Sequence, residues 1–430
     1  MKKTVAFHSF GCKLNQSETQ SLEKGFVDRG YDVVSFEEKA DYYVVDTCTV
    51  TDQADSKCRN IIRKAERNNP DGRVIVTGCM AQMESDRIKE INPKSLIVGT
   101  FEKFNMFDIL HDVEQSDSWE TGGIFTDENK VFVPTQTQET SSRTRAFLKV
   151  QDGCNYICSF CIIPFSRGRD RSNAFEKSIG EAKDLIASGY KEITLTGVNI
   201  GEYKDGEKRI DDLVEAISDL SGLERLRISS IEPNTVTDRL ISLVKERENI
   251  MPHFHVPIQS GSAEILKKMR RHYDRDGIER ILDRICTELP NASLGSDFII
   301  GFPQETDTHF METVSLIEAY PFTYYHTFTY SSRQKTIAER MDGHIDSKTK
   351  AQRSEYLRKL MDAKKLAFAE ANIGKQFNVL FEGKPHNGVQ NGFTDNYIKT
   401  FVPTPVELEN QIKRVEITHI EDRKAFGRLV

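Results

Sequence analysis

The sequence predicts an α/β protein with a wound parallel sheet first, a partial barrel of parallel strands next and a small β-barrel last. The chain has 430 residues, and at roughly 100 to 200 residues per domain this length favours two to four domains. Short apolar runs alternate with helix-like polar stretches through most of the chain, which is typical of parallel strands joined by helices. Past about residue 370 the pattern changes to short strands and turns.

The first 111 residues form the predicted N-terminal α/β domain. Residues 56–65 have the spacing of an amphipathic helix. Four buried strands are expected, at 4–10, 41–46, 73–77 and 95–98.

A polar stretch at 112–142 predicts a linker, and the central domain is expected at 143–369. Helical stretches, for example 175–187 and 211–220, lie between its strands and predict outer helices packed on a partial (β/α)6 barrel. The six predicted strands are 146–151, 192–197, 225–231, 253–258, 294–300 and 323–330.

Residues 370–430 predict a small β-barrel, a module that often binds single-stranded or looped RNA. Aromatic side chains there can stack on unpaired bases or form the core of the barrel. A docking or capping domain is the alternative interpretation. The aromatics are Phe377, Phe381, Phe393, Tyr397 and Phe401.

The composition and the net charge of the chain limit the classes of protein to which it can belong. Charged residues make up 29% and hydrophobic residues 38% of the chain, which is ordinary for a globular protein. The start of the sequence lacks a secretory apolar segment and no apolar run approaches the roughly 18 residues of a membrane helix, so a cytoplasmic protein is expected. The net charge is −7, so a nucleic-acid partner requires local basic patches.

Three of the eight cysteines, Cys12, Cys48 and Cys79, each come just past a predicted strand. Their separations are about one βα unit of roughly 30 residues or slightly more. Because the carboxyl ends of parallel strands line one crevice, these thiols are expected to converge. Three unrelated buried thiols are the alternative, since cysteine is often buried.

Three more cysteines, Cys154, Cys158 and Cys161, lie in one loop after the first barrel strand. Structural zinc needs four ligands, whereas three thiolates can hold a cubane iron–sulfur cluster and leave one iron open. An open iron above a parallel barrel can chelate S-adenosylmethionine and support its reductive cleavage. The remaining two, Cys58 and Cys286, are interpreted as packing thiols.

These motifs resemble the methylthiotransferase family of radical S-adenosylmethionine enzymes across essentially the whole chain. The resemblance rests on the Cys154–Cys161 loop, on a tail similar to a TRAM domain and on three segments, Gly11-Cys12-Lys13-Leu14-Asn15, Thr47-Cys48-Thr49-Val50-Thr51 and Gly78-Cys79-Met80-Ala81-Gln82. It implies a radical-generating [4Fe-4S] cluster on Cys154, Cys158 and Cys161, and an auxiliary [4Fe-4S] cluster on Cys12, Cys48 and Cys79.

The resemblance also implies two uses of S-adenosylmethionine, as methyl donor and as source of a 5′-deoxyadenosyl radical, with an electron donor of the flavodoxin or ferredoxin type. Radical abstraction suits an unactivated C–H bond, which offers acid–base catalysis no acidic proton. The residues implied to contact the cofactor are Phe160, Thr196, Gly197, Asn199, Gln259, Ser260 and Gly301. For Gly301 a plain strand-ending turn is the alternative.

Three branches of the family differ in substrate: threonylcarbamoyladenosine in tRNA, isopentenyladenosine in tRNA, and an aspartate of a ribosomal protein. The segment 162–172 and the segments around Cys12 and Cys48 resemble the threonylcarbamoyl branch. This implies methylthiolation at C2 of the adenosine at position 37, in the tRNA anticodon stem-loop. Asp46 departs from the asparagine that the family commonly has before Thr-Cys.

Local basic groups offer phosphate contacts. Arg167, Arg169 and Arg171 alternate close to the cysteine loop, so RNA binding is expected there. A solvated charged face is the preferred interpretation of the Arg59–Arg67 group. A cluster-carrying RNA-binding or redox-sensing protein without catalysis remains the non-enzymatic alternative.

Overall fold

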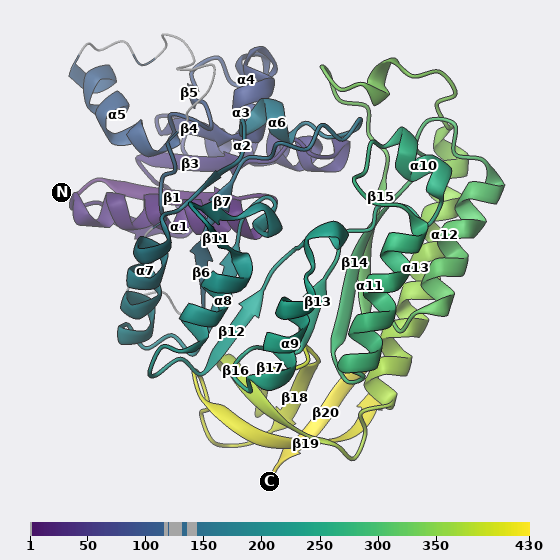
Figure 1. The fold of residues 1–430 in the computed structure, drawn as a ribbon. Coiled ribbons are helices and arrows are strands. Elements are labelled where there is room, and N and C mark those ends of the chain that lie inside the picture. The colour runs from purple at the N-terminus through teal and green to yellow at the C-terminus, as the bar shows by residue number, and fades with distance from the viewer. Residues whose placement is uncertain (1, 116–118, 120–130, 136–143) are drawn as a thin grey trace. The chain divides into compact units, whose positions relative to one another are not determined.

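A computed structural model of the chain describes residues 2–115, 119, 131–135 and 144–430 (Figure 1). The chain forms two compact units. The first consists of Met1–Glu139, Lys149–Asn173 and Ser331–Glu339, and the second of Thr140–Leu148, Ala174–Tyr330 and Arg340–Val430. None of the described helices combines the length and apolar character needed to cross a bilayer.

A five-stranded parallel sheet in the order β2-β1-β3-β4-β5 is the centre of the first unit. The four predicted strands are confirmed, whereas β2, a short and largely exposed edge strand, was not expected. The strands are β1 (Thr4–Ser9), β2 (Asp32–Val34), β3 (Tyr42–Thr47), β4 (Arg73–Gly78) and β5 (Leu96–Val98).

Helices cover both faces of this sheet. On one face, Tyr43 and Val45 of β3 pack with side chains of α2, α3 and α4, and on the other Tyr42 and Val44 pack with α1 and α5. Burial on both faces explains why these strands are nearly continuous apolar runs. The helices are α1 (Lys13–Asp28), α2 (Asp52–Asn68), α3 (Cys79–Met83), α4 (Ser85–Ile91), the 3₁₀ turn η1 (Lys103–Asn105) and α5 (Met106–Gln115).

The first unit also contains a short hairpin-like element that frames the second cysteine set. Strand β7 (Gln151–Asp152) pairs antiparallel with β8 (Arg171–Ser172), and α6 (Ile163–Ser166) lies between them in sequence. Helix α5 extends into the beginning of the predicted linker, and most of the rest of that linker lies outside the described residues.

Six strands in the order β6-β9-β12-β13-β14-β15 form the partial barrel of the second unit, as predicted. They make two three-stranded sheets, which parallel bridges join at Leu226–Ile250 and Ser230–His255. The strands are β6 (Arg145–Lys149), β9 (Glu192–Thr196), β12 (Arg225–Ile228), β13 (His253–His255), β14 (Ser293–Ile300) and β15 (Tyr324–Thr329).

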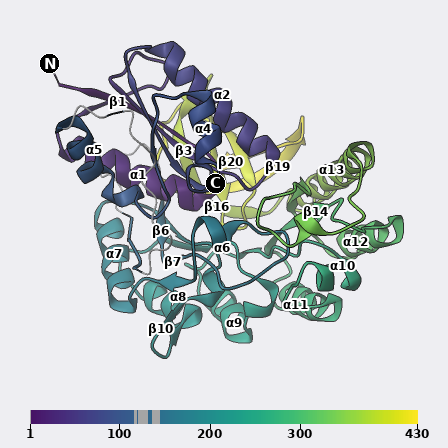
Figure 2. The same cartoon turned by 90° about the horizontal axis from the view of Figure 1, so that it is seen from above.

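Helices lie along the outer side of these strands (Figure 2). The predicted helix at 175–187 is found unchanged, whereas the long last helix, α13, was not anticipated. The helices are α7 (Phe175–Ala187), α8 (Ile210–Ser218), α9 (Asp238–Glu246), α10 (Ala263–Lys268), α11 (Arg275–Glu288), α12 (Asp307–Ala319) and α13 (Ser347–Glu370). Smaller elements are β10 (Lys204–Asp205), β11 (Lys208–Arg209), η2 (Ile200–Glu202), η3 (Pro233–Thr235) and η4 (Ala338–Arg340).

The tail closes into a five-stranded barrel in the order β16-β17-β18-β20-β19, which confirms the predicted TRAM-like fold. Val379, Phe381 and Val415 belong to its core, so Phe381 has the structural rather than the base-stacking role. The strands are β16 (Gln376–His386), β17 (Val389–Thr394), β18 (Lys399–Pro403), β19 (Ile412–Glu421) and β20 (Lys424–Leu429).

Candidate functional site

The first cysteine set lies at the carboxyl ends of three neighbouring strands. Cys12 follows β1 and precedes α1, Cys48 follows β3, and Cys79 follows β4. The thiols interact electrostatically in all three pairs. A Cβ atom added to Gly11 would lie 3.1 Å from Cys48 Sγ. The structure therefore brings these three thiols together, although they are far apart in sequence.

Burial makes two of these thiols poor acids. Cys48 and Cys79 are buried, whereas Cys12 is exposed. Loss of hydration raises the pKa of Cys48 and of Cys79, and the neighbouring thiols raise it further. Near Cys79, however, Arg167, Lys103 and a hydrogen bond from Ser166 favour the thiolate. These groups offset part of the effect of burial at Cys79.

The donor set fits an iron–sulfur cluster better than a single metal ion. Among the described residues no group of three His, Cys, Asp or Glu side chains is arranged to hold one ion. In a cubane each thiolate binds a different iron, so the sulfurs stand farther apart than ligands of a single ion do. Three thiols at one sheet edge with cations beside them suit an anionic cluster.

Glycines at positive φ immediately precede three of the cysteines, Cys12, Cys79 and Cys154, and the last two show why glycine is needed. Gly78, before Cys79, has a φ of +94°, and a Cβ there would collide with the Asp46 side chain and the Thr47 carbonyl. Gly153, before Cys154, has a φ of +71°, and a Cβ there would collide with the Arg169 carbonyl. Only glycine tolerates both the conformation and the contact.

The second cysteine set occupies the loop between β7 and α6 in the same compact unit. Cys158 is buried, and Cys154 and Cys161 are half-buried. The Tyr156 amide donates to Cys154 Sγ over 3.4 Å, and the Cys154 amide donates to the Gly168 carbonyl over 3.1 Å. Backbone hydrogen bonds thus hold this loop in a defined course.

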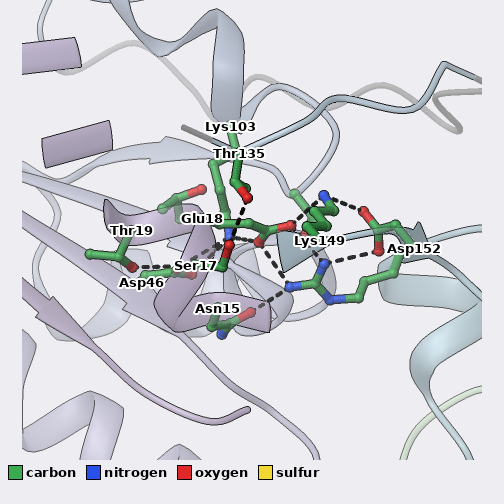
Figure 3. A network of polar contacts seen from close by, with 12 residues as sticks. Asn15, Ser17, Glu18, Thr19, Asp46, Lys103, Thr135, Lys149 and Asp152 are labelled. Carbon is green, nitrogen blue, oxygen red and sulfur yellow. Dashed lines mark hydrogen bonds and ion pairs between the residues drawn. The ribbon is translucent and has the colours of Figure 1, made fainter. Parts of the chain in front are cut away.

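A fully buried charge network lies in the first unit (Figure 3). Glu18 on α1 lies at its centre and forms ion pairs with Lys103, Lys149 and Arg167. Lys103 Nζ lies 2.6 Å from Glu18 Oε2 and 3.0 Å from Asp46 Oδ1. Lys149 Nζ lies 2.9 Å from Glu18 and 2.9 Å from Asp152. Arg167 lies 2.9 Å from Glu18 and 3.0 Å from Asp152.

These contacts connect the segments that carry both cysteine sets. Asp46 belongs to the strand before Cys48, Asp152 to the strand before Cys154, and Glu18 to the helix after Cys12. Asn15 adds a direct tie, because its side-chain amide donates to the carbonyls of Phe10 (2.8 Å) and Thr47 (3.1 Å). The network therefore fixes the cysteine-bearing segments of the first unit in one arrangement.

The ionisation states follow from burial and charge. Burial opposes the charge on Glu18, but Arg167, Lys103 and Lys149 outweigh it and hold the Glu18 pKa well below its usual range. Asp152 is likewise buried, and Lys149, Arg167 and Arg171 lower its pKa to about 2. Burial raises the pKa of Asp46 although Lys103 opposes this. The unusual Asp46 thus shares its cationic partner, Lys103, with Glu18.

The expected RNA contact at Arg167 is wrong in this structure. Arg167 is only 1% exposed, and its guanidinium is taken up by Glu18, Asp152 and Asn15. Arg171 is mostly buried and pairs with Asp152 at 2.9 Å. Of the three predicted arginines only Arg169 is exposed.

The residues predicted to contact S-adenosylmethionine follow strand ends. In the second unit Thr196 and Asn199 come at and after the end of β9, and Gln259 and Ser260 come after β13. Gly301 follows β14 with a φ of +68°, and its amide donates to Glu305 Oε2 over 2.6 Å, so it also makes the strand-ending turn. Gly197 follows Thr196, and Phe160 lies half-buried in the cysteine loop of the first unit.

Glu18, Lys103, Lys149 and Asp152 of the buried network, and one acid of the second unit, were not predicted from the sequence. The burial of Glu18 could have been inferred from the sequence, because α1 has few apolar residues and must bury polar ones. Asn15, Ser17 and Glu18 lie on its buried face. In the second unit Glu232 follows β12, and burial raises its pKa to about 7 despite the opposing charge of Arg271. Lys103 and Lys149 gave no sequence signal of burial.

Comparison with known proteins identifies the family. Residues 4–99 match the family model described as "Uncharacterized protein family UPF0004", and residues 148–317 match the Radical SAM superfamily. The chain is 37% identical over 421 residues to threonylcarbamoyladenosine tRNA methylthiotransferase MtaB of Bacillus subtilis, covering 96% of this chain and 93% of that protein. The chain belongs to the radical S-adenosylmethionine methylthiotransferase family.

Other relatives in this family differ in their named substrates. The MtaB protein of Aquifex aeolicus is 36% identical, with coverage of 87% of this chain and 92% of that protein. A tRNA-2-methylthio-N(6)-dimethylallyladenosine synthase of Jannaschia sp. is 31% identical, with coverage of 100% and 95%. The solved structure of the methyltransferase TsrM from Kitasatospora setae, with cobalamin and a [4Fe-4S] cluster bound, shares the fold at a TM-score of 0.57 and 15% identity, covering 91% of this chain and 81% of that one.

Proposed function

We propose that this methylthiotransferase converts the C2–H bond of N6-threonylcarbamoyladenosine at position 37 of tRNA to C2–SCH3. The observation that carries the proposal is the presence of two cysteine triplets in one compact unit, one at the ends of three parallel strands and one in a single loop. The similarity to relatives named for threonylcarbamoyladenosine supports the choice of substrate.

The residues present suit two [4Fe-4S] clusters. Cys12, Cys48 and Cys79 would hold the auxiliary cluster, and the loop cysteines 154, 158 and 161 would hold the radical cluster. When bound, the clusters and S-adenosylmethionine supply a 5′-deoxyadenosyl radical and a methylthio group. The chain contributes the positive surroundings of Cys79, from Arg167 and Lys103, and the fixed course of the cysteine segments.

Cofactor contacts are proposed at strand ends, as in other parallel barrels. Backbone and side-chain groups of Thr196, Gly197 and Asn199 would hold the amino-acid end of S-adenosylmethionine. Gln259, Ser260 and Gly301 would face the nucleoside, and Phe160 would lie against the purine.

The proposed partners are the tRNA anticodon stem-loop and a flavodoxin- or ferredoxin-type electron donor in the cytoplasm. Within the first unit, Arg169 would contact a phosphate of the RNA, a proposal that its exposure supports. In the C-terminal barrel, Phe401 is only partly buried and is proposed to stack on an unpaired base.

Nucleoside mass spectrometry of tRNA tests the function. In cells lacking the protein we expect 2-methylthio-N6-threonylcarbamoyladenosine to disappear, and the wild-type chain but not Cys158→Ala to restore it. Cys286→Ala is the matched control, because Cys286 lies in α11 outside both triplets, and it should restore the nucleoside.

The other outcomes separate the alternatives. Loss of 2-methylthio-N6-isopentenyladenosine instead would favour the dimethylallyl branch, to which relatives of 31 to 33% identity belong. If both nucleosides are unchanged, the ribosomal aspartate becomes the candidate. If the reduced, cluster-loaded protein forms no 5′-deoxyadenosine from S-adenosylmethionine, the enzyme assignment is wrong and a cluster-carrying binding protein is favoured.

A further inference from the structure

The second unit contains a groove of about 1110 Å³ that borders α9 and α11. Its walls are the segment after β12, the beginning and end of α10, and the first three turns of α11. The helices concerned are neighbours on the outer side of the strands (Figure 2). None of the residues predicted to bind cofactor lines this groove.

Positive charge predominates among the lining side chains. Four cations and one histidine face two carboxylates, the members being Lys267, Arg271, His272, Arg280, Arg284, Asp238 and Asp274. Both carboxylates are engaged, since Asp238 lies 3.2 Å from Arg284 and Asp274 accepts from the Gly277 amide at the start of α11 over 2.9 Å.

Two of the cations remain for an external anion. Lys267 and Arg280 are exposed, and within the described part of the chain neither has a carboxylate at ion-pair distance. Arg271, by contrast, is paired with Glu232. The groove therefore has an uncompensated positive charge, in a chain whose net charge is −7.

We propose that this groove binds backbone phosphates of the tRNA on which the protein acts, an inference that rests on the proposed function. Lys267 and Arg280 are exposed and belong to different helices, α10 and α11, so one small anion would stay hydrated and gain little. A polyanion gains from each contact, because every neutralised phosphate releases counterions.

The position of the groove fits the same partner. Pro233 and Asn234 of its wall follow the carboxyl end of β12, and Ala263 begins the helix after β13. The predicted cofactor residues Thr196 and Gln259 also come at or after the carboxyl ends of their strands, β9 and β13. A base that enters the barrel at that end brings its flanking phosphates to the rim, where they fix the position of the RNA without reading its sequence.

The test is the salt dependence of tRNA binding by the full chain. For Lys267→Gln/Arg280→Gln we expect about 10-fold weaker binding of an unmodified tRNA transcript at moderate salt. The plot of log K against log salt should become shallower by about 1.8, that is about 0.9 for each of two lost phosphate contacts. The charge-keeping variant Lys267→Arg/Arg280→Lys should keep the wild-type slope.

A charge-matched control is Lys348→Gln/Lys365→Gln on α13. Both lysines are exposed, and their helix packs on β15, where Tyr325 donates to the Leu357 carbonyl. The control should bind as the wild type does. If the groove variant matches the control in affinity and slope, the inference is wrong while the proposed function stands. If the wild type itself does not bind tRNA, the proposed function fails, and the inference fails with it.

Discussion

Each compact unit contains a buried glutamate surrounded by three cations, and these two charge networks have different roles. In the first unit Glu18 joins Lys103, Lys149 and Arg167. In the second, Glu192 joins Arg227 at 2.9 Å, Arg225 at 3.7 Å and Arg145 at 4.0 Å. Positive neighbours lower the pKa of both carboxyl groups, that of Glu192 to about 2, against the opposing effect of burial.

The difference lies in what the cations reach beyond the glutamate. Arg225 donates to the main-chain carbonyls of Asn378 (2.6 Å) and Phe393 (3.0 Å), so the Glu192 cluster fastens the C-terminal barrel to the strands. The cations around Glu18 instead pair with Asp46 and Asp152, which lie in the strands before Cys48 and Cys154. The same electrostatic arrangement thus supports domain packing in one unit and placement of metal ligands in the other.

The largest effect is expected from Glu18→Gln. Removing this charge leaves Lys103, Lys149 and Arg167 buried with only Asp46 and Asp152, and breaking a buried pair typically costs about 3–5 kcal/mol. We expect the free energy of unfolding of the iron-free chain to fall by about 4 kcal/mol. After reconstitution, iron should be bound roughly 10-fold less tightly, as when a supporting partner of metal ligands is lost.

Urea unfolding and iron analysis under limiting iron measure these two quantities. The control is Glu355→Gln, which should change neither quantity, because Glu355 forms an exposed ion pair with Lys359 on α13 and such pairs contribute little. A Glu18→Gln protein that loses stability but binds iron as the wild type does would contradict the role assigned to the charge network around Glu18.

The pH dependence of the free energy of unfolding isolates the contribution of Glu192. Its pKa is lowered from 4.5 to about 2, so its ionised form stabilises the fold above pH 4.5, and this stability is lost as the pH falls toward 2. At pH 3 the wild type should have lost about 2 kcal/mol that Glu192→Gln never had, since one pKa unit corresponds to about 1.36 kcal/mol.

The measurement is the free energy of unfolding at pH 6, 4.5 and 3 for both proteins. The gap between them should be widest at pH 6, at about 3 kcal/mol, and narrow toward pH 3. Iron binding by Glu192→Gln should equal that of the wild type. If this variant also loses iron, the different roles assigned to the Glu18 and Glu192 charge networks are wrong.

The sequence predicted the regular elements better than the polar interior. Helix α7 has strong apolar periodicity and was predicted residue for residue, and all six central strands were found. Individual strands of the C-terminal barrel are harder to predict, because glycine and polar residues interrupt the apolar positions of β17 and β20, and a turn with Asp422 and Arg423 at positive φ connects β20 to β19. Pairing with neighbouring strands of the closed barrel holds these two strands in place.

In the candidate site, too, the polar residues were harder to predict than the regular elements. Both cysteine sets follow from spacing and strand ends, which are local properties of the sequence. The charge network does not, since Glu18 and Arg167 are 149 residues apart and only tertiary structure pairs them. A charged residue is normally exposed, and that rule led to the incorrect RNA contact at Arg167.

The smallest effect is expected from Cys58→Ala, which tests whether the first unit is sensitive to charge or to any change near its cysteines. Cys58 of α2 is fully buried in the apolar core on one face of the sheet, as the sequence predicted for a packing thiol, and its thiol donates to the Cys48 carbonyl at 3.5 Å. Removing one sulfur from a packed core should cost about 1 kcal/mol.

Iron binding should be unchanged, because Cys58 is neither a proposed ligand nor part of the charge network. Iron analysis beside Cys48→Ala, which should lose the auxiliary cluster, decides this. If Cys58→Ala also loses iron, then packing against Cys48, and not only the charges around Glu18, holds the auxiliary cysteines in place.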